Sequence, residues 1–140
     1  MEIVGLGSQV MECARVRKLI DQHGETFLKQ VYTDREVQFC NGKARTTEQF
    51  TALWAAKEAV FRALGTTWKR GTSWTDIEVV CENSAALQVV VSGPTAELMT
   101  ARGITQVMLT TAFCREFATA TAIAGRQTSA RPAEDTALDD

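Results

Sequence analysis

A lysine and a glutamate stand side by side in an apolar helical segment, and their types and spacing indicate chemistry. Lys57 and Glu58 lie in the stretch WAAKEAVFRALG, residues 54–65. At about 100° per residue, Lys57 falls in the middle of an apolar stripe, and Glu58 falls at its edge with Arg62 one turn further on. Ionised side chains are rarely placed against a core without a partner. Such a pair is typical of a site that holds phosphate or a metal ion.

A second interpretation of the same residues needs no ligand. Lys57 would extend past the core to reach solvent, and Glu58 and Arg62 would form an ordinary ion pair on the helix surface. The helix alone leaves both interpretations open. The apolar stripe that fixes its orientation consists of Phe50, Leu53, Trp54, Phe61 and Leu64.

The elements that must position this helix form an α+β pattern in one domain. Ser8 is expected to cap the first helix, and the patterns T-D-R-E from Thr33 and T-T-E-Q from Thr46 are expected to be capping boxes. Gly65 is expected to end the long helix. The predicted strands are 1–7, 76–81, 87–92, 106–113 and 116–123, and the predicted helices are 10–22, 26–32, 33–40, 46–65 and a short one from Pro94 to Gly103. The polar residues 126–140 are expected to be a disordered tail.

Composition narrows the class of protein. The chain has 140 residues of which 45% are apolar, enough for one domain with a buried core. A net charge of -2 gives no indication of nucleic-acid binding. There is no apolar run of the roughly 20 residues that span a bilayer, and no signal-peptide pattern. A single histidine argues against a zinc site, and widely separated cysteines fit a reducing compartment. We therefore expect a cytoplasmic domain without nucleic-acid or membrane contacts.

Several segments, taken in order, resemble the bacterial holo-acyl-carrier-protein synthases, which are small 4'-phosphopantetheinyl transferases. Residues 54–65 are similar to the family signature F-A-A-K-E-A-x-x-K-A-x-G, and residues 71–79 are similar to G-I-S-W-x-D-I-E-V. Residues 5–7 resemble the opening G-I-G, and the stretch from Phe27 to Glu36 resembles F-L…T-x-x-E. The resemblance runs through nearly all of residues 1–125. It implies the family fold, an antiparallel sheet packed on a long helix.

The resemblance also implies an activity. Family members move phosphopantetheine from coenzyme A to a serine of an apo acyl carrier protein, in fatty-acid or polyketide biosynthesis. They are typically homotrimers with active sites at subunit interfaces. Magnesium is held by an aspartate after the first strand and by the glutamate that matches Glu58. Lys57 and Arg62 would then steady the phosphates. The basic residues that would face the acidic carrier protein are Arg15, Arg17 and Lys18.

The chain departs from the family pattern on the nucleotide and metal side. Gln9 stands where the family has its metal-binding aspartate, and an amide is a poorer magnesium ligand than a carboxylate. Ala112 and Phe113 replace the second serine and the histidine of the L-S-x-S-H strand, which helps to hold the adenosine end of coenzyme A. The G-K-P-like turn is replaced by residues 85–87. The basic helix and the signature helix are kept.

Two hypotheses follow from this contrast. In the first, the chain is a transferase with an altered pocket, in which Glu58, water molecules and the pyrophosphate still hold magnesium. In the second, it keeps the fold and carrier-protein docking without transferring phosphopantetheine. It would then be a silent partner or an enzyme that acts on a carrier-bound acyl group.

The remaining candidate residues each have an ordinary structural interpretation. Cys114 has no second histidine near its strand to activate it, and His23 suits a capping role at a helix end. Trp68 would cover a ligand or line a subunit contact. Lys69 and Arg70 would contact phosphate or would simply be solvated.

Overall fold

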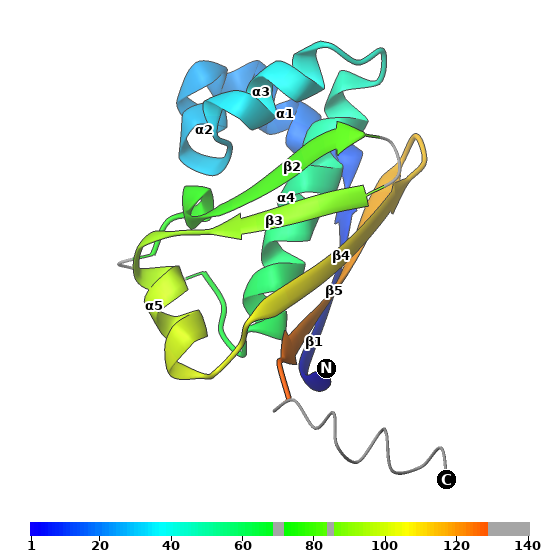
Figure 1. Cartoon of the computed structure of the whole chain (residues 1–140). Helices are drawn as coiled ribbons and strands as arrows, with labels where there is room; N and C mark the ends of the chain where they lie inside the picture. The colour runs from blue at the N-terminus through cyan, green and yellow to red at the C-terminus, as the bar shows by residue number, and fades with distance from the viewer. Residues whose placement is uncertain (69–71, 84–85, 129–140) are drawn as a thin grey trace, which may run out of the picture.

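The computed structural model describes residues 1–68, 72–83 and 86–128. In this part of the chain, one strand and four helices come first, and four strands with one further helix follow, packed around the long fourth helix (Figure 1). The elements are β1 (Glu2–Glu12), α1 (Cys13–His23), α2 (Glu25–Val31), α3 (Asp34–Asn41), α4 (Thr46–Ala63), a 3-10 turn η1 (Trp74–Asp76), β2 (Ile77–Asn83), β3 (Ala86–Val91), α5 (Gly93–Ala101), β4 (Gln106–Phe113) and β5 (Phe117–Arg126).

Two antiparallel sheets lie against α4. β5 is the central strand of a three-stranded sheet in the order β1-β5-β4, and β2 pairs with β3 in a separate hairpin. β3 and β4 run beside each other in Figure 1 without belonging to one hydrogen-bonded sheet. The α+β fold with an antiparallel sheet on a long helix is therefore confirmed.

Small residues let β1 and β5 approach α4 closely. The inward-facing positions of β5 are all alanines, Ala118, Ala120, Ala122 and Ala124, and all are buried. A Cβ atom at Gly7 would lie 2.1 Å from the carbonyl oxygen of Ala59, so no larger residue fits there. This close packing buries most of α4, whose core residues come from every turn of the helix.

The first strand is longer than predicted. β1 runs to Glu12 because it pairs with β5 along its whole length, from Glu2 opposite Arg126 to Glu12 opposite Phe117. The prediction that Ser8 caps a helix from residue 10 is therefore wrong, and α1 begins at Cys13. Local helical spacing in residues 10–12 is outweighed by the hydrogen bonds of the sheet, which place Gln9 inside the strand.

Of the two predicted capping boxes, the one at Thr33 is confirmed and the one at Thr46 is not. Thr33 accepts a hydrogen bond from the Glu36 amide at 3.3 Å, and the Glu36 carboxylate accepts one from the Thr33 amide at 2.9 Å. The second box is wrong: Arg45 is the N-cap of α4 and makes no side-chain cap bond. The Thr46 hydroxyl donates instead to the carbonyl of Lys43 at 2.9 Å. Helix α4 nevertheless starts at residue 46, and Gly65 follows it with φ of +84°.

The C-terminal half follows the predicted pattern closely. β4 has the predicted bounds, while β5 continues three residues beyond the predicted end at Ile123. The predicted tail starts too early, because Arg126 is the last residue of β5 and pairs with Glu2. The rest of that expectation falls mostly on residues 129–140, outside the described part of the chain, as does residue 85 of the altered turn. None of the helices in the described part is both long and apolar enough to cross a membrane.

Candidate active site

Glu58 lies where β1 crosses α4, and two other side chains meet its carboxylate. The Gln9 amide donates a hydrogen bond from Nε2 to Glu58 Oε2. A nitrogen of the Arg62 guanidinium lies 3.8 Å from the same oxygen, one helical turn away. The Glu58 side chain is 23% exposed and that of Arg62 is 51% exposed, so the group lies at the surface. Sequence spacing predicted the pair in α4, and the family resemblance predicted that position 9 lies at the same site as Glu58; the structure shows that Gln9 contacts Glu58 directly.

A hollow of about 250 Å³ opens beside this group. Trp68 and Trp74 form one wall, with their rings stacked at 6.0 Å and nearly parallel, at 9°. Phe61 meets Trp74 edge-on at 5.6 Å. The hollow therefore combines one carboxylate and one guanidinium with flat aromatic surfaces. We name it the Glu58 hollow, and its lining residues are Glu58, Phe61, Arg62, Thr67, Trp68 and Trp74.

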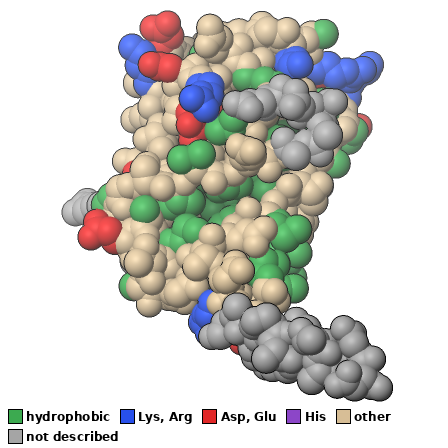
Figure 2. All heavy atoms as spheres, in the orientation of Figure 1, with side chains coloured by type: hydrophobic (Ala, Val, Ile, Leu, Met, Phe, Trp, Pro, Cys, Tyr) green, Lys and Arg blue, Asp and Glu red, His purple; other side chains and the backbone are tan. Residues whose placement is uncertain are grey.

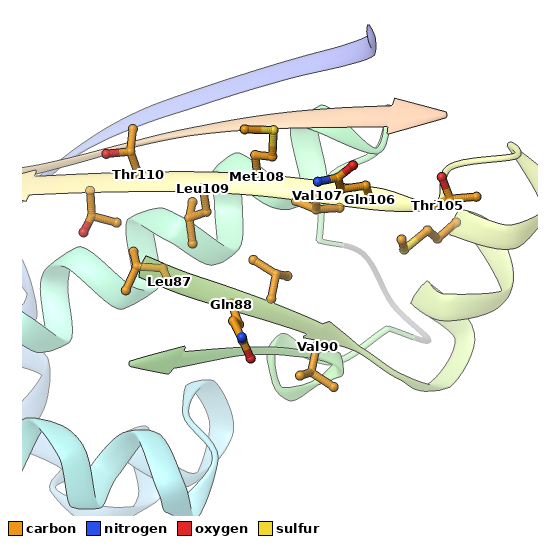
Figure 3. A pocket seen from close by; sticks show the side chains of 12 residues that line it. Leu87, Gln88, Val90, Thr105, Gln106, Val107, Met108, Leu109 and Thr110 are labelled. Carbon is orange, nitrogen blue, oxygen red and sulfur yellow. The ribbon is translucent and has the colours of Figure 1, made fainter. Parts of the chain in front are cut away.

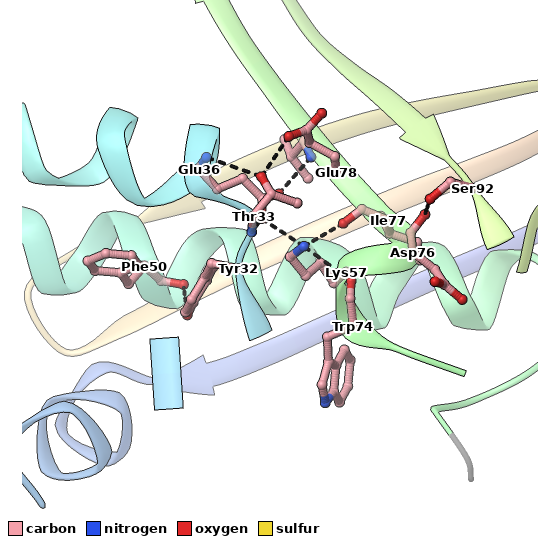
Figure 4. Close-up of polar contacts among 11 residues, drawn as sticks. Tyr32, Thr33, Glu36, Phe50, Lys57, Trp74, Asp76, Ile77, Glu78 and Ser92 are labelled. Carbon is pink, nitrogen blue, oxygen red and sulfur yellow. Dashed lines mark hydrogen bonds and ion pairs between the residues drawn. The ribbon is translucent and has the colours of Figure 1, made fainter. Parts of the chain in front are cut away.

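Lys57 is absent from this lining because its side chain points into the protein (Figure 4). Its ammonium lies 2.8 Å from the Glu36 carboxylate, and both side chains are 0% exposed. It also donates to the backbone carbonyls of Trp74, at 3.2 Å, and Ile77. The structure thus does not bring Lys57 together with Glu58, although the two are adjacent in sequence. The surface interpretation of Lys57 is also excluded, since its ammonium does not reach solvent.

The surroundings of Lys57 perturb its ionisation in opposite directions. Burial lowers its pKa below the ordinary value of 10.5, and the Glu36 carboxylate partly opposes that change. Glu36 also accepts a hydrogen bond from the Val79 amide at 2.7 Å, so α3, α4 and β2 meet at this carboxylate. Sequence reasoning recognised Glu36 only as a capping residue. The one sequence feature that indicated its role as a buried counter-charge was a lysine in the apolar stripe of α4, which would need a partner.

The predicted carrier-facing residues lie on α1. Arg15, Arg17 and Lys18 are all exposed. The Arg15 guanidinium lies over the ring of Trp54 at 5.4 Å from its centroid. Trp54 in turn meets Trp74, in the wall of the Glu58 hollow, at 5.8 Å. The contacts of Arg15 with Trp54 and of Trp54 with Trp74 therefore connect α1 to the Glu58 hollow.

The other predicted site residues lie elsewhere. Ala112 and Phe113 are exposed at the end of β4 and do not line the Glu58 hollow. Cys114 is exposed just after them, and His23 is exposed at the last position of α1. Lys69 and Arg70 fall outside the described residues.

A wide groove of about 740 Å³ separates β3 from β4 (Figure 3). Hydrophobic side chains gather on this hollowed face of the molecule (Figure 2). The groove lining includes Leu87, Val89, Met99, Val107 and Leu109 with several threonines and glutamines, and none of the described residues that line it is ionisable. Because it offers no charge, it is a poorer place for a phosphate than the Glu58 hollow.

The donor set at Glu58 does not suit a resident magnesium ion. Magnesium prefers charged oxygen ligands in octahedral geometry. Gln9 uses Nε2 toward Glu58, and its Oε1 accepts a hydrogen bond from the Val10 amide at 3.1 Å. Within the described residues, no three or more His, Cys, Asp or Glu side chains gather in a way that could hold a metal ion. Glu58 is thus paired with an amide and a guanidinium rather than with a second carboxylate.

Comparison with known proteins gives a consistent match. Residues 5–122 match the family model described as the 4'-phosphopantetheinyl transferase superfamily. The chain is 39% identical to the holo-[acyl-carrier-protein] synthase of Rhodopirellula baltica, over 82% of this chain and 91% of that protein. It is 40% identical to the enzyme of the same name from Chlamydia trachomatis serovar D, over 86% of this chain and 98% of that protein.

Solved structures show the same fold. The holo-[acyl-carrier-protein] synthase of Neisseria meningitidis matches with a TM-score of 0.80 at 20% identity, covering 89% of this chain and 99% of that one. The Bacillus anthracis enzyme, solved in complex with CoA (3',5'-ADP), matches with a TM-score of 0.73 at 27% identity, covering 91% of this chain and 100% of that one.

Proposed function

This chain belongs to the 4'-phosphopantetheinyl transferase superfamily, and from that premise we propose that it transfers 4'-phosphopantetheine from coenzyme A to a serine of an apo acyl carrier protein. The serine oxygen forms a bond to the pantetheine-side phosphorus of the pyrophosphate. The bond from that phosphorus to the bridging oxygen breaks, and adenosine 3',5'-bisphosphate leaves with the electron pair. The serine hydroxyl gives its proton to water, so one proton is released together with the bisphosphate.

The observation that carries the proposal is the Glu58 hollow in the centre of the matched region. Phosphoryl transfer depends mainly on positioning and on compensating charge. Arg62 offers a half-exposed guanidinium suited to phosphate oxygens. Trp68 and Trp74 offer an apolar surface against which the uncharged part of the donor would pack.

The carrier protein would dock on α1. Its exposed basic residues suit an acidic partner, and charge complementarity speeds and orients such an encounter. The aromatic line from Arg15 through Trp54 to Trp74 places this surface beside the Glu58 hollow. A carrier serine delivered from α1 would therefore arrive near the bound pyrophosphate.

A homotrimer is part of the proposal and is supported by the outer face of the three-stranded sheet. Leu6, Ile123 and Met108 are cross-strand neighbours and form one apolar row across β1, β5 and β4. Leu6 is 66% exposed and Met108 is 48% exposed in the single chain, so the row would gain from being covered. A second subunit would also bring a β4 end, with Ala112 and Phe113, to the adenosine side of a neighbouring hollow.

A cytoplasmic location and a role in fatty-acid or polyketide biosynthesis complete the proposal. All four cysteines, which lie in the described part of the chain, are free thiols. Free thiols are favoured in a reducing compartment.

The test is the mass of an apo acyl carrier protein after incubation with this chain and coenzyme A, with and without a divalent cation. A gain equal to one phosphopantetheine group supports the proposal. Absence of a gain under both conditions contradicts it, provided that an established holo-[acyl-carrier-protein] synthase modifies the same carrier in parallel.

A further inference from the structure

Both polar atoms of the Gln9 side-chain amide already make hydrogen bonds within the protein. Nε2 donates to the Glu58 carboxylate, which lies on α4, and Oε1 accepts from the Val10 amide at 3.1 Å within β1. β1 holds this side chain in place because the residue pairs with Ala120 in the middle of the sheet. The oxygen that would have to ligate a cation is therefore turned away from Glu58.

The opposite orientation of the amide is disfavoured on simple grounds. It would place Oε1 against a carboxylate oxygen and Nε2 against the Val10 N–H. Two acceptors would then face each other at Glu58, and two donors would face each other at Val10. The orientation that satisfies both ends is the one that presents a donor to Glu58.

The net charge of the group formed by Gln9, Glu58 and Arg62 also disfavours a bound cation. Gln9 is neutral, and the charges of Glu58 and Arg62 cancel, so the group as a whole is neutral. A carboxylate at position 9 would make the group negative by one unit and would attract a divalent cation that the present group does not attract.

We propose that the free protein has no resident divalent-cation site at Glu58, because Gln9 and Arg62 occupy the carboxylate that such a cation would use. A cation that bound there would have to displace the Gln9 hydrogen bond and compete with the guanidinium. The inference concerns the site of the proposed transfer, but it is tested on the free protein.

The test is direct titration of the free protein with Mn²⁺, followed by the loss of the electron paramagnetic resonance signal of the free ion. Gln9→Glu is nearly isosteric and replaces the donor with a carboxylate, and Gln9→Asp gives the shorter carboxylate. Gln9→Glu combined with Glu58→Gln removes the second carboxylate. Gln88→Glu is the matched charge control, because Gln88 is exposed on β3 and does not line the Glu58 hollow.

We expect at least one single variant at Gln9 to bind Mn²⁺ tenfold or more tightly than the unchanged protein. The double variant and Gln88→Glu should behave like the unchanged protein. The proposal is overturned if the unchanged protein binds one equivalent of Mn²⁺ that Glu58→Gln abolishes, or if neither Gln9 variant gains affinity. The carrier-mass assay measures transfer, whereas the Mn²⁺ titration measures cation binding by the free protein. If the proposed transfer fails, the titration therefore still tests the cation site.

Discussion

The ammonium of Lys57 lies 2.8 Å from the carboxylate of Glu36, and neither side chain is exposed. The same carboxylate accepts hydrogen bonds from the amides of Thr33 and Val79, at 2.9 and 2.7 Å. Glu36 thus joins the start of α3 to the centre of α4 and to β2. The lysine of the signature helix holds the domain together from inside, while the next residue, Glu58, faces the site.

Removing one member of this buried pair should destabilise the fold strongly. We expect Lys57→Met to lower the free energy of unfolding by about 3–5 kcal/mol, because Glu36 would stay buried without its counter-charge. Urea denaturation measures the change. Arg62→Met, which removes a half-exposed partner of Glu58, should cost about 1 kcal/mol or less and serves as the control. A loss at Lys57 no larger than at Arg62 would contradict the structural role.

Alkaline pH should weaken the fold through Cys40. Burial, followed by the charge of Glu36, raises the pKa of this thiol far above its ordinary value of 9.0. In the unfolded chain the thiol ionises above 9.0, whereas in the folded chain it stays neutral, so the unfolded state binds fewer protons. The stability that Cys40 contributes is therefore complete below 9.0 and falls as pH rises beyond it, by up to about 1.4 kcal/mol per pH unit.

Urea unfolding of the protein and of Cys40→Ala, at pH values on both sides of 9.0, isolates this contribution. Lys57 also has a shifted pKa, but it remains in both proteins and cancels in the comparison. The measurements stay below pH 10.0, the ordinary pKa of tyrosine, because burial, followed by the charge of Cys40, raises the pKa of Tyr32. We expect the alanine variant to have the shallower decline. Parallel declines would show that the Cys40 thiol ionises equally in both states.

Reversing charge on α1 should weaken carrier binding. We expect Arg17→Glu to raise the dissociation constant for an acidic apo carrier roughly tenfold and to flatten its dependence on salt. Lys29→Glu, on α2, is the matched control and should bind normally. Arg15→Glu should also reduce stability, because its guanidinium packs on Trp54. If Arg17→Glu leaves affinity unchanged, α1 faces something other than the carrier.

A charge in the apolar row of the outer sheet face should prevent assembly. Leu6→Asp would place a carboxylate at the β1 end of this row, at its most exposed residue, and we expect a shift from trimer to monomer in light scattering coupled to gel filtration. Val90→Asp changes an equally apolar exposed residue on β3 and should leave the assembly unchanged. A monomeric parent protein would contradict the proposed trimer directly.

The sequence predicted those features that depend on local pattern. The long helix, the Thr33 capping box and β4 were found because helical spacing, cap chemistry and alternation act within a few residues. The length of β1 was missed because residues 8–12 are held by β5, more than a hundred positions away.

At the site, too, helical spacing predicted only the contact between residues that are close in sequence. Glu58 and Arg62 lie one turn apart on a helix, so their spacing alone pairs them. Gln9 meets Glu58, and Glu36 meets Lys57, only through the packing of distant elements. Helical spacing placed Lys57 on the buried side of α4, but it could not identify Glu36 as its partner, because Glu36 lies on a different helix.

We propose that phosphopantetheine transfer takes place at Glu58. The most direct measurement is the initial rate of carrier mass gain for the protein and for Glu58→Gln, with circular dichroism to confirm that the variant is folded. The variant keeps a side chain of the same size but removes the carboxylate that holds the Arg62 guanidinium beside the hollow. We expect a loss on the order of a hundredfold, because the phosphates then lack a correctly placed counter-charge. An unchanged rate in a folded variant would contradict the claim and would place the reaction elsewhere on the protein.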